Sequence, residues 1–109
     1  TEYETLACEY LIRHGYQILC RNFRCRQGEI DIIARDRDYL VFIEVKYRRD
    51  EHEGDPAEAV DARKQARILR TARYYMTHYH ISEDTPCRFD VVAVLGSNVR
   101  LIRDAFWCG

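Results

Sequence analysis

Two long apolar runs separated by a short connection constrain the fold of this chain most. Residues 28–36 read GEIDIIARD and residues 39–48 read YLVFIEVKYR. Their aliphatic and aromatic residues favour β-strands, and the connection between them predicts a tight antiparallel hairpin. Both runs also contain charged side chains, so the pair is either a sheet with one solvated face or a functional site.

The other segments predict two helices and three further strands. Apolar residues recur at helical spacing in two segments, and three more segments have the composition of strands. The expected helices are 3–14 and 56–79, the second with Asp55 as N-cap and Pro56 at its start, and the expected strands are 16–26, 86–96 and 99–106. The predicted order is α-β-β-β-α-β-β, an α/β class with a mixed sheet, in one domain spanning residues 1–109.

Composition narrows the class of protein. The 109 residues have a net charge of -1 and are 47% hydrophobic, and no apolar run approaches the ~18 residues needed to cross a bilayer. We therefore expect a soluble protein without a membrane partner. The five cysteines form no CxxC pair, which favours a reducing cytoplasm over a disulfide framework, and their spacing does not support a zinc site.

Positive charge is segregated along the chain rather than spread evenly. Three arginines lie within residues 21–26, and five basic residues lie within 63–73, while residues 50–61 collect six acids. The arginine stripe of 63–73 points away from the apolar face of the predicted helix, so we interpret it as a solvated helix face.

Asp31, Glu44 and Lys46 have the types and spacing that phosphodiester hydrolysis requires. Side chains two apart on a strand share a face, so Glu44 and Lys46 point together with Phe42, and hairpin pairing brings Asp31 toward Glu44. Two carboxylates can bind a hard divalent cation, and a lysine beside them can orient or deprotonate water or balance phosphate charge. The alternative is an ordinary solvated sheet face, which the apolar surroundings disfavour because unpaired buried carboxylates are costly.

Four segments, in order, resemble a known family. They read GEIDIIARD, LVFIEVKYR, GDPAEAVDARKQARILRTARYY and CRFDVVAV. They are similar to the successive blocks of the YraN-like family of uncharacterised bacterial proteins, which resembles the Holliday-junction-resolvase-like branch of the PD-(D/E)XK nucleases. The resemblance implies a restriction-endonuclease-like core. Asp31 would be its motif aspartate, Glu44 its acid and Lys46 its lysine, with Glu29 beside them. No proline precedes Asp31, but this family usually has an aliphatic residue there, as Ile30 is here.

The resemblance also implies a glutamate from the first helix. Glu4 lies at the border of the apolar face and Glu9 points away from it, so we assign Glu4, with a favourable helix-dipole role as the alternative. Lys64 and Gln65 lie in the predicted long helix, whose first turns are placed to face the carboxylates. Both are expected nucleic-acid contacts. A solvated helix lysine is the alternative for Lys64, and Gln65 requires a buried hydrogen-bond partner.

The resemblance favours a metal-dependent endonuclease acting on DNA rather than RNA, branched DNA included, with Mg²⁺ or Mn²⁺ bound by Asp31 and Glu44. A homodimer or a protein partner could complete the surface, because a near-neutral chain binds a polyanion weakly alone. The alternative function is a non-catalytic nucleic-acid- or protein-binding module that retains the fold. The expected contacts to the nucleic-acid backbone are Arg21, Arg24, Arg26, Arg48 and Arg49.

Overall fold

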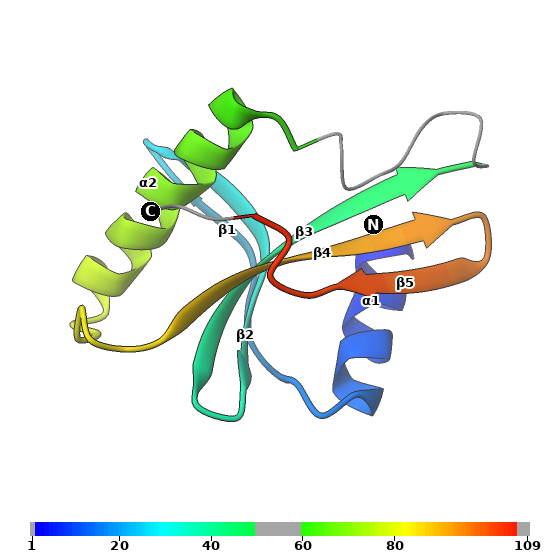
Figure 1. Cartoon of the computed structure of the whole chain (residues 1–109), viewed down its shortest axis with the longest axis horizontal. Helices are drawn as coiled ribbons and strands as arrows, with labels where there is room; N and C mark the ends of the chain where they lie inside the picture. The colour runs from blue at the N-terminus through cyan, green and yellow to red at the C-terminus, as the bar shows by residue number, and fades with distance from the viewer. Residues whose placement is uncertain (1, 50–59, 107–109) are drawn as a thin grey trace.

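The structure, a computed structural model, describes residues 2–49 and 60–106 (Figure 1). The elements follow in the order α1 (Glu2–Arg13), β1 (Gln17–Cys25), β2 (Gly28–Asp36), β3 (Tyr39–Arg48), α2 (Ala62–His78), β4 (Cys87–Leu95) and β5 (Asn98–Ile102). This is the predicted α-β-β-β-α-β-β order, and the predicted α/β class with a mixed sheet is confirmed. No helix within the described ranges is both long and apolar enough to span a membrane.

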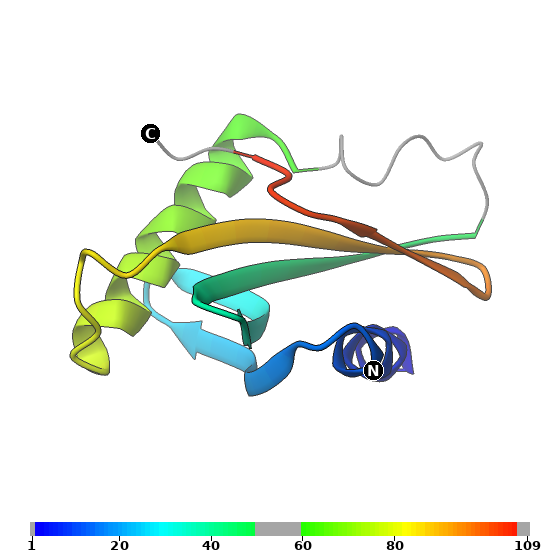
Figure 2. The ribbon, with the colours of Figure 1, turned by 60° about the horizontal axis from the view of Figure 1, so that its bottom comes forward.

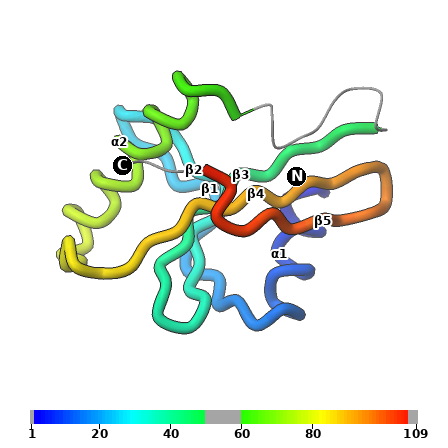
Figure 3. Tube along the Cα trace, in the orientation of Figure 1, coloured from blue at the N-terminus to red at the C-terminus, as the bar shows by residue number. Residues whose placement is uncertain are grey.

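The five strands form one sheet in the order β1-β2-β3-β4-β5. Strands β1, β2 and β3 form an antiparallel meander, β4 pairs parallel to β3, and β5 returns antiparallel to β4. A parallel pair needs a crossover connection, and α2 supplies it between β3 and β4. In Figure 3 the β2–β3 turn lies at the bottom of the molecule and the β4–β5 turn at the right.

The two helices cover opposite faces of the sheet (Figure 2). On the α1 side, Leu11 packs with Val41 and Ile43 of β3. On the α2 side, Tyr75 packs with Phe42, and their rings meet edge to face with centroids 6.0 Å apart. Because both faces are covered, the central strands are apolar nearly throughout, as the sequence of β3 indicated.

Helix α2 begins later than predicted. Val60 and Asp61 are not helical, and the helix starts at Ala62 with Asp61 as N-cap, whose side chain accepts a hydrogen bond from the backbone N–H of Lys64 at 2.9 Å. The predicted continuous helix over 56–79 is therefore wrong at its start, and the predicted cap, Asp55 with Pro56, lies outside the described residues. The new start places Lys64 in the first turn of the helix.

A buried polar network anchors β4 at the end of the sheet where that strand begins. Asp90 is fully buried and accepts hydrogen bonds from the Tyr16 hydroxyl and from Nε of Arg88, both at 2.9 Å. Arg88 also donates to Oδ2 of Asp36 at 2.8 Å, and the backbone N–H of Asp104 donates to Asp90 at 2.9 Å. These bonds satisfy the buried carboxylate of Asp90, so we assign the network a structural role. None of the predicted catalytic residues belongs to it.

Candidate catalytic site

The candidate site forms where β2 and β3 separate. Their backbone pairing runs from Asp36 and Tyr39 at the turn to Ile32 and Ile43, while β3 continues to pair with β4 as far as Arg48. Asp31 is the first residue of β2 beyond the last pair. Its Oδ2 accepts a hydrogen bond from the backbone N–H of Val45 at 2.8 Å. A carboxylate therefore bridges the two strands where a regular ladder would have a carbonyl oxygen.

An irregularity in β2 fixes the position of Asp31. Ile30 packs in the core under α2, whereas Ile32 packs in the core under α1. Residues two apart in a regular strand would share a face, so the backbone rotates at Asp31. Across the ladder, Asn22 of β1 lies between two paired residues and has a positive φ of 54°. The distortion of both strands directs the Asp31 side chain toward β3.

Glu44 is the centre of a cluster with two lysines. Its side chain is 10% exposed, and its Oε1 lies 3.1 Å from Nζ of Lys64 and 3.7 Å from Nζ of Lys46. Lys46 comes from the same strand, two residues on, while Lys64 comes from the first turn of α2. Phe42 packs under α2. Phe42, Glu44 and Lys46 therefore share the α2 face of β3, as the two-residue period of a strand predicts.

Burial and mutual charge shift the protonation of this cluster. Burial, followed by the charge of Glu44, raises the pKa of Asp31 to about 7, although the hydrogen bond from Val45 acts in the opposite direction. Burial and the neighbouring Lys64 lower the pKa of Lys46. Burial also acts to lower the pKa of Lys64, but its bonds with Lys46 and Glu44 outweigh burial and raise it. Of the two lysines, Lys46 releases its proton more readily and Lys64 stays charged.

The donor set suits a hard divalent cation rather than zinc. Among the described residues no three His, Cys, Asp or Glu side chains gather as a metal-binding group. Asp31 and Glu44 are nonetheless close enough for the charge of one to shift the pKa of the other. Mg²⁺ is commonly held by one or two carboxylates together with waters and substrate phosphates, whereas structural zinc takes four protein ligands. Asp31 and Glu44 have the oxygen donors that Mg²⁺ or Mn²⁺ would take.

The two further predicted acids lie in different surroundings. Glu4 of α1 accepts a hydrogen bond from Nδ2 of Asn22 at 3.1 Å, and its charge contributes to the raised pKa of Asp31. The structure thus brings Glu4 to the edge of the cluster. Glu29 instead forms an exposed ion pair with Arg24 at 3.0 Å and is not brought into the cluster.

Asn22, which donates a hydrogen bond to Glu4, was not among the residues predicted from the sequence. Its signal was modest, since a single Asn among the apolar and basic residues of β1 is only a weak indication of a turn or a bulge. Its positive φ marks the irregular point of β1, and its hydrogen bond joins that point to the Glu4 carboxylate.

The predicted nucleic-acid contacts are dispersed. Gln65 is half-buried, and its Nε2 donates to the carbonyl oxygen of Val60 at 2.8 Å, which supplies the partner that its position required. Arg21 donates to the hydroxyl of Thr5 at 3.3 Å, and Arg48 donates to the neighbouring carbonyl oxygen of Tyr47. Like Arg21, the predicted contacts Arg24, Arg26 and Arg49 are exposed.

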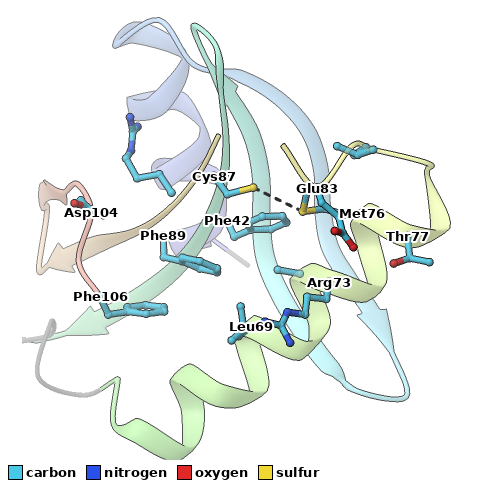
Figure 4. A pocket seen from close by; sticks show the side chains of 13 residues that line it. Phe42, Leu69, Arg73, Met76, Thr77, Glu83, Cys87, Phe89, Asp104 and Phe106 are labelled. Carbon is cyan, nitrogen blue, oxygen red and sulfur yellow. Dashed lines mark hydrogen bonds between the residues drawn. The ribbon is translucent and has the colours of Figure 1, made fainter. Parts of the chain in front are cut away.

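A groove of about 650 Å³ lies elsewhere, between α2 and the start of β4 (Figure 4). Phe42, Phe89 and Phe106 line its floor, and Leu69 and Arg73 face it from α2. None of the predicted catalytic residues lines this groove. The carboxylate cluster, formed by Asp31, Glu44, Lys46 and Lys64, therefore lies outside this groove.

A sequence model described as Uncharacterised protein family UPF0102 matches residues 3–94, which run from α1 to near the end of β4. The chain belongs to the UPF0102 family. The matched range of this UPF0102 chain includes Asp31, Glu44, Lys46 and Lys64 of the cluster and Glu4 at its edge.

Curated relatives match nearly the whole length of this UPF0102 chain. The UPF0102 protein of Lachnoclostridium phytofermentans is 56% identical over 103 residues, covering 94% of this chain and 87% of the relative. The UPF0102 protein of Nitrosococcus oceani is 44% identical over 107 residues, with 94% and 86% covered. That of Caldicellulosiruptor bescii is 48% identical over 110 residues, with 94% and 92% covered.

Proposed function

We propose that this chain is a metal-dependent endonuclease that hydrolyses phosphodiester bonds in DNA, with Mg²⁺ or Mn²⁺ bound by Asp31 and Glu44. One observation carries the proposal: two carboxylates and two lysines converge where β2 and β3 separate, with Oε1 of Glu44 within 3.1 Å of Lys64 and 3.7 Å of Lys46. Charged groups with shifted pKa values in such surroundings are typical of catalytic sites. The resemblance to resolvase-like nucleases adds support and favours branched DNA as substrate.

Each residue has a role in this chemistry. Asp31 and Glu44 would hold the cation, which when bound activates water and stabilises negative charge on the phosphate. Lys46, whose pKa is lowered, would in its neutral form accept a proton from the attacking water. Lys64 keeps its proton and balances the charge that develops on the phosphate oxygens. Glu4 lies at the edge of the cluster, close enough for its charge to act on Asp31.

The burial of these acids is a reason to expect a function. A carboxyl group whose pKa is raised to about 7 destabilises the folded chain at neutral pH when it is ionised. Proteins keep such unfavourable groups mainly where they perform chemistry. We place this activity in the cytoplasm, because a reducing compartment suits the free thiols of Cys8, Cys20, Cys25 and Cys87.

A second candidate function is a non-catalytic binding module for nucleic acid or protein. The Lys64–Glu44 ion pair favours it, because Glu44 already has a cationic partner without a metal ion. The net charge of -1 also predicts weak binding to a polyanion by the chain alone, so a homodimer or a protein partner would complete the surface.

Titration calorimetry with MnCl₂ distinguishes the two functions. The nuclease predicts saturable binding that is lost in Asp31→Asn, an exchange that keeps the size of the side chain and an acceptor for Val45. Asp38→Asn is the matched control, because Asp38 is exposed in the turn between β2 and β3. Saturable binding lost only in Asp31→Asn supports the nuclease. Absence of Mn²⁺ binding, together with salt-dependent DNA binding in EDTA, supports the binding module and contradicts the nuclease.

A further inference from the structure

Helix α2 is basic along its whole length. Its residues 62–78 include five cations and no Asp or Glu, and its first turn contains no acid. Arg63 and Lys64 lie at the positive end of the helix dipole, and Arg63, Arg67 and Arg70 are like charges at i,i+4 and i,i+3 spacing. Each of these arrangements is unfavourable for the helix. These arginines are exposed, as expected for a solvated helix face. Solvated faces usually mix acids with bases, so the uniform positive charge of α2 needs a further explanation.

One stripe of α2 adjoins the turn between β1 and β2. A Cβ on Gly28 would lie 2.8 Å from Cγ of Arg67 and 2.9 Å from Oγ1 of Thr71, so the turn rests against the middle of the helix. Figure 1 shows this turn beside α2. Arg26 is exposed in the same turn. The contact therefore joins a basic turn to a basic helix face in one continuous surface.

The stripe continues along α2 with an aromatic side chain. Arg63, Arg67, Arg70 and Tyr74 follow one another at i+4, i+3 and i+4 spacing, which keeps them on one side over about 16 Å of helix. Tyr74 is 43% exposed, and its ring is nearly parallel to that of His78, with centroids 5.8 Å apart. Arginines with an exposed aromatic ring among them are typical of surfaces that bind nucleic-acid strands.

Two observations fix the extent of this surface. Arg73 is excluded, because it lines the groove between α2 and the start of β4, on another side of the helix (Figure 4). At the start of the helix, Lys64 follows Arg63 directly and contacts Glu44 at 3.1 Å. The stripe therefore begins beside the carboxylate cluster.

We propose that this ridge, formed by Arg63, Arg67, Arg70 and Tyr74 of α2 with Arg26 of the β1–β2 turn, binds the sugar–phosphate backbone of a nucleic-acid strand and leads it to the carboxylate cluster. The inference rests on the proposed nuclease function, for which it supplies the surface that holds the substrate. Its contacts are to phosphates, so binding is independent of base sequence and sensitive to salt. The unfavourable charge of α2 is then neutralised when the strand is bound.

Fluorescence anisotropy with labelled duplex and single-stranded DNA in EDTA tests the ridge without cleavage. The ridge variant is the triple change Arg63→Gln, Arg67→Gln and Arg70→Gln. The matched control is Arg13→Gln, Arg37→Gln and Arg103→Gln, which removes the same charge from exposed positions on other elements. We expect the ridge variant to bind roughly tenfold more weakly or worse, and the slope of log K against log [NaCl] to fall by about 2 to 3 on duplex DNA. The control variant should bind like the wild type.

Thermal unfolding of the same variants excludes a folding defect as the cause. Because like charges are removed from α2, the ridge variant should unfold at the same temperature as the wild type or higher. Equal weakening by both triple variants, or unchanged binding by the ridge variant, would overturn the ridge. If the ridge fails in this way but the wild type cleaves DNA with metal, the proposed nuclease function would stand without the ridge. Ridge-dependent binding without cleavage would support the ridge and overturn the nuclease.

Discussion

Nζ of Lys64 lies 3.1 Å from Oε1 of Glu44, so the first turn of α2 is joined to β3 by an ion pair with a nearly buried carboxylate. Asp61 fixes this geometry because it caps the helix and sets which residues form its first turn. The first turn of α2 thereby places the Lys64 ammonium group beside the carboxylates, independently of Lys46 on β3. The two lysines consequently differ in the direction of their pKa shifts.

Lys64→Met should separate metal binding from catalysis. Lys64 competes with a metal ion for Glu44, so its loss should leave Mn²⁺ affinity unchanged or raise it. Cleavage should still fall by about 10- to 100-fold, because a charge that stabilises the transition state is missing. Calorimetry and single-turnover cleavage measure the two effects, with Lys64→Arg as the charge-preserving control. Weaker Mn²⁺ binding with an unchanged cleavage rate would contradict this role.

Without metal, Asp31 should make the stability of the chain fall as the pH rises. The folded pKa of about 7 is above the ordinary value of 3.8, so between these values the folded state binds more protons than the unfolded state. The unfavourable contribution of Asp31 to stability is absent below the pKa of its carboxyl group in the unfolded chain. It is complete above the pKa of that group in the folded chain. Allowing for partial exposure of the carboxyl group, we expect a loss of roughly 2 kcal/mol between about pH 5 and pH 8.

Urea unfolding in EDTA compares the wild type with Asp31→Asn across this pH range. The variant has no carboxyl group to ionise and should lack this part of the pH dependence. Parallel stability curves for the two proteins would show that the pKa of Asp31 is not raised.

Gly28→Ala should disrupt the contact between the β1–β2 turn and α2. Gly28 has φ +150°, and an added Cβ would lie 2.8 Å from Arg67. Gly15→Ala is the matched control, because Gly15 also has a positive φ, +89°, but nothing lies within 4 Å of its added Cβ. Urea unfolding should show a loss of about 2 to 3 kcal/mol for Gly28→Ala and about 1 kcal/mol for Gly15→Ala. Equal losses would mean that the turn does not rest tightly on the helix.

The sheet and the faces of β3 follow from period-two alternation, because each side chain of a central strand must enter one of two covered layers. Alternation places Glu44 and Lys46 together but does not locate Asp31. That position depends on the rotation of β2 between Ile30 and Ile32 and on the bond to Val45, which involve non-local pairing. For the same reason, Glu29 could not be assigned to its ion pair with Arg24 from spacing alone.

The start of α2 illustrates a competition between local signals. Asp55 with Pro56 and Asp61 are both good N-terminal signals, and the sequence does not rank them. Among the described residues, Val60 is buried and accepts a hydrogen bond from Gln65, and Asp61 caps the helix. The sequence does not predict the network of Arg88 and Asp90 either, because its partners Tyr16 and Asp36 lie far away in the sequence.

Cleavage of labelled DNA is the direct test of the proposed nuclease activity. Duplex, single-stranded and four-way-junction DNA would be incubated with the wild type, Asp31→Asn, Lys46→Met and the control Asp38→Asn, with Mg²⁺ or Mn²⁺ and with EDTA, after identical purification. We expect metal-dependent cleavage by the wild type and Asp38→Asn, and a loss of about a thousandfold or more in the other two variants. Cleavage that persists in Asp31→Asn, or a folded, Mn²⁺-bound wild type that cuts none of these substrates, would contradict the proposed activity.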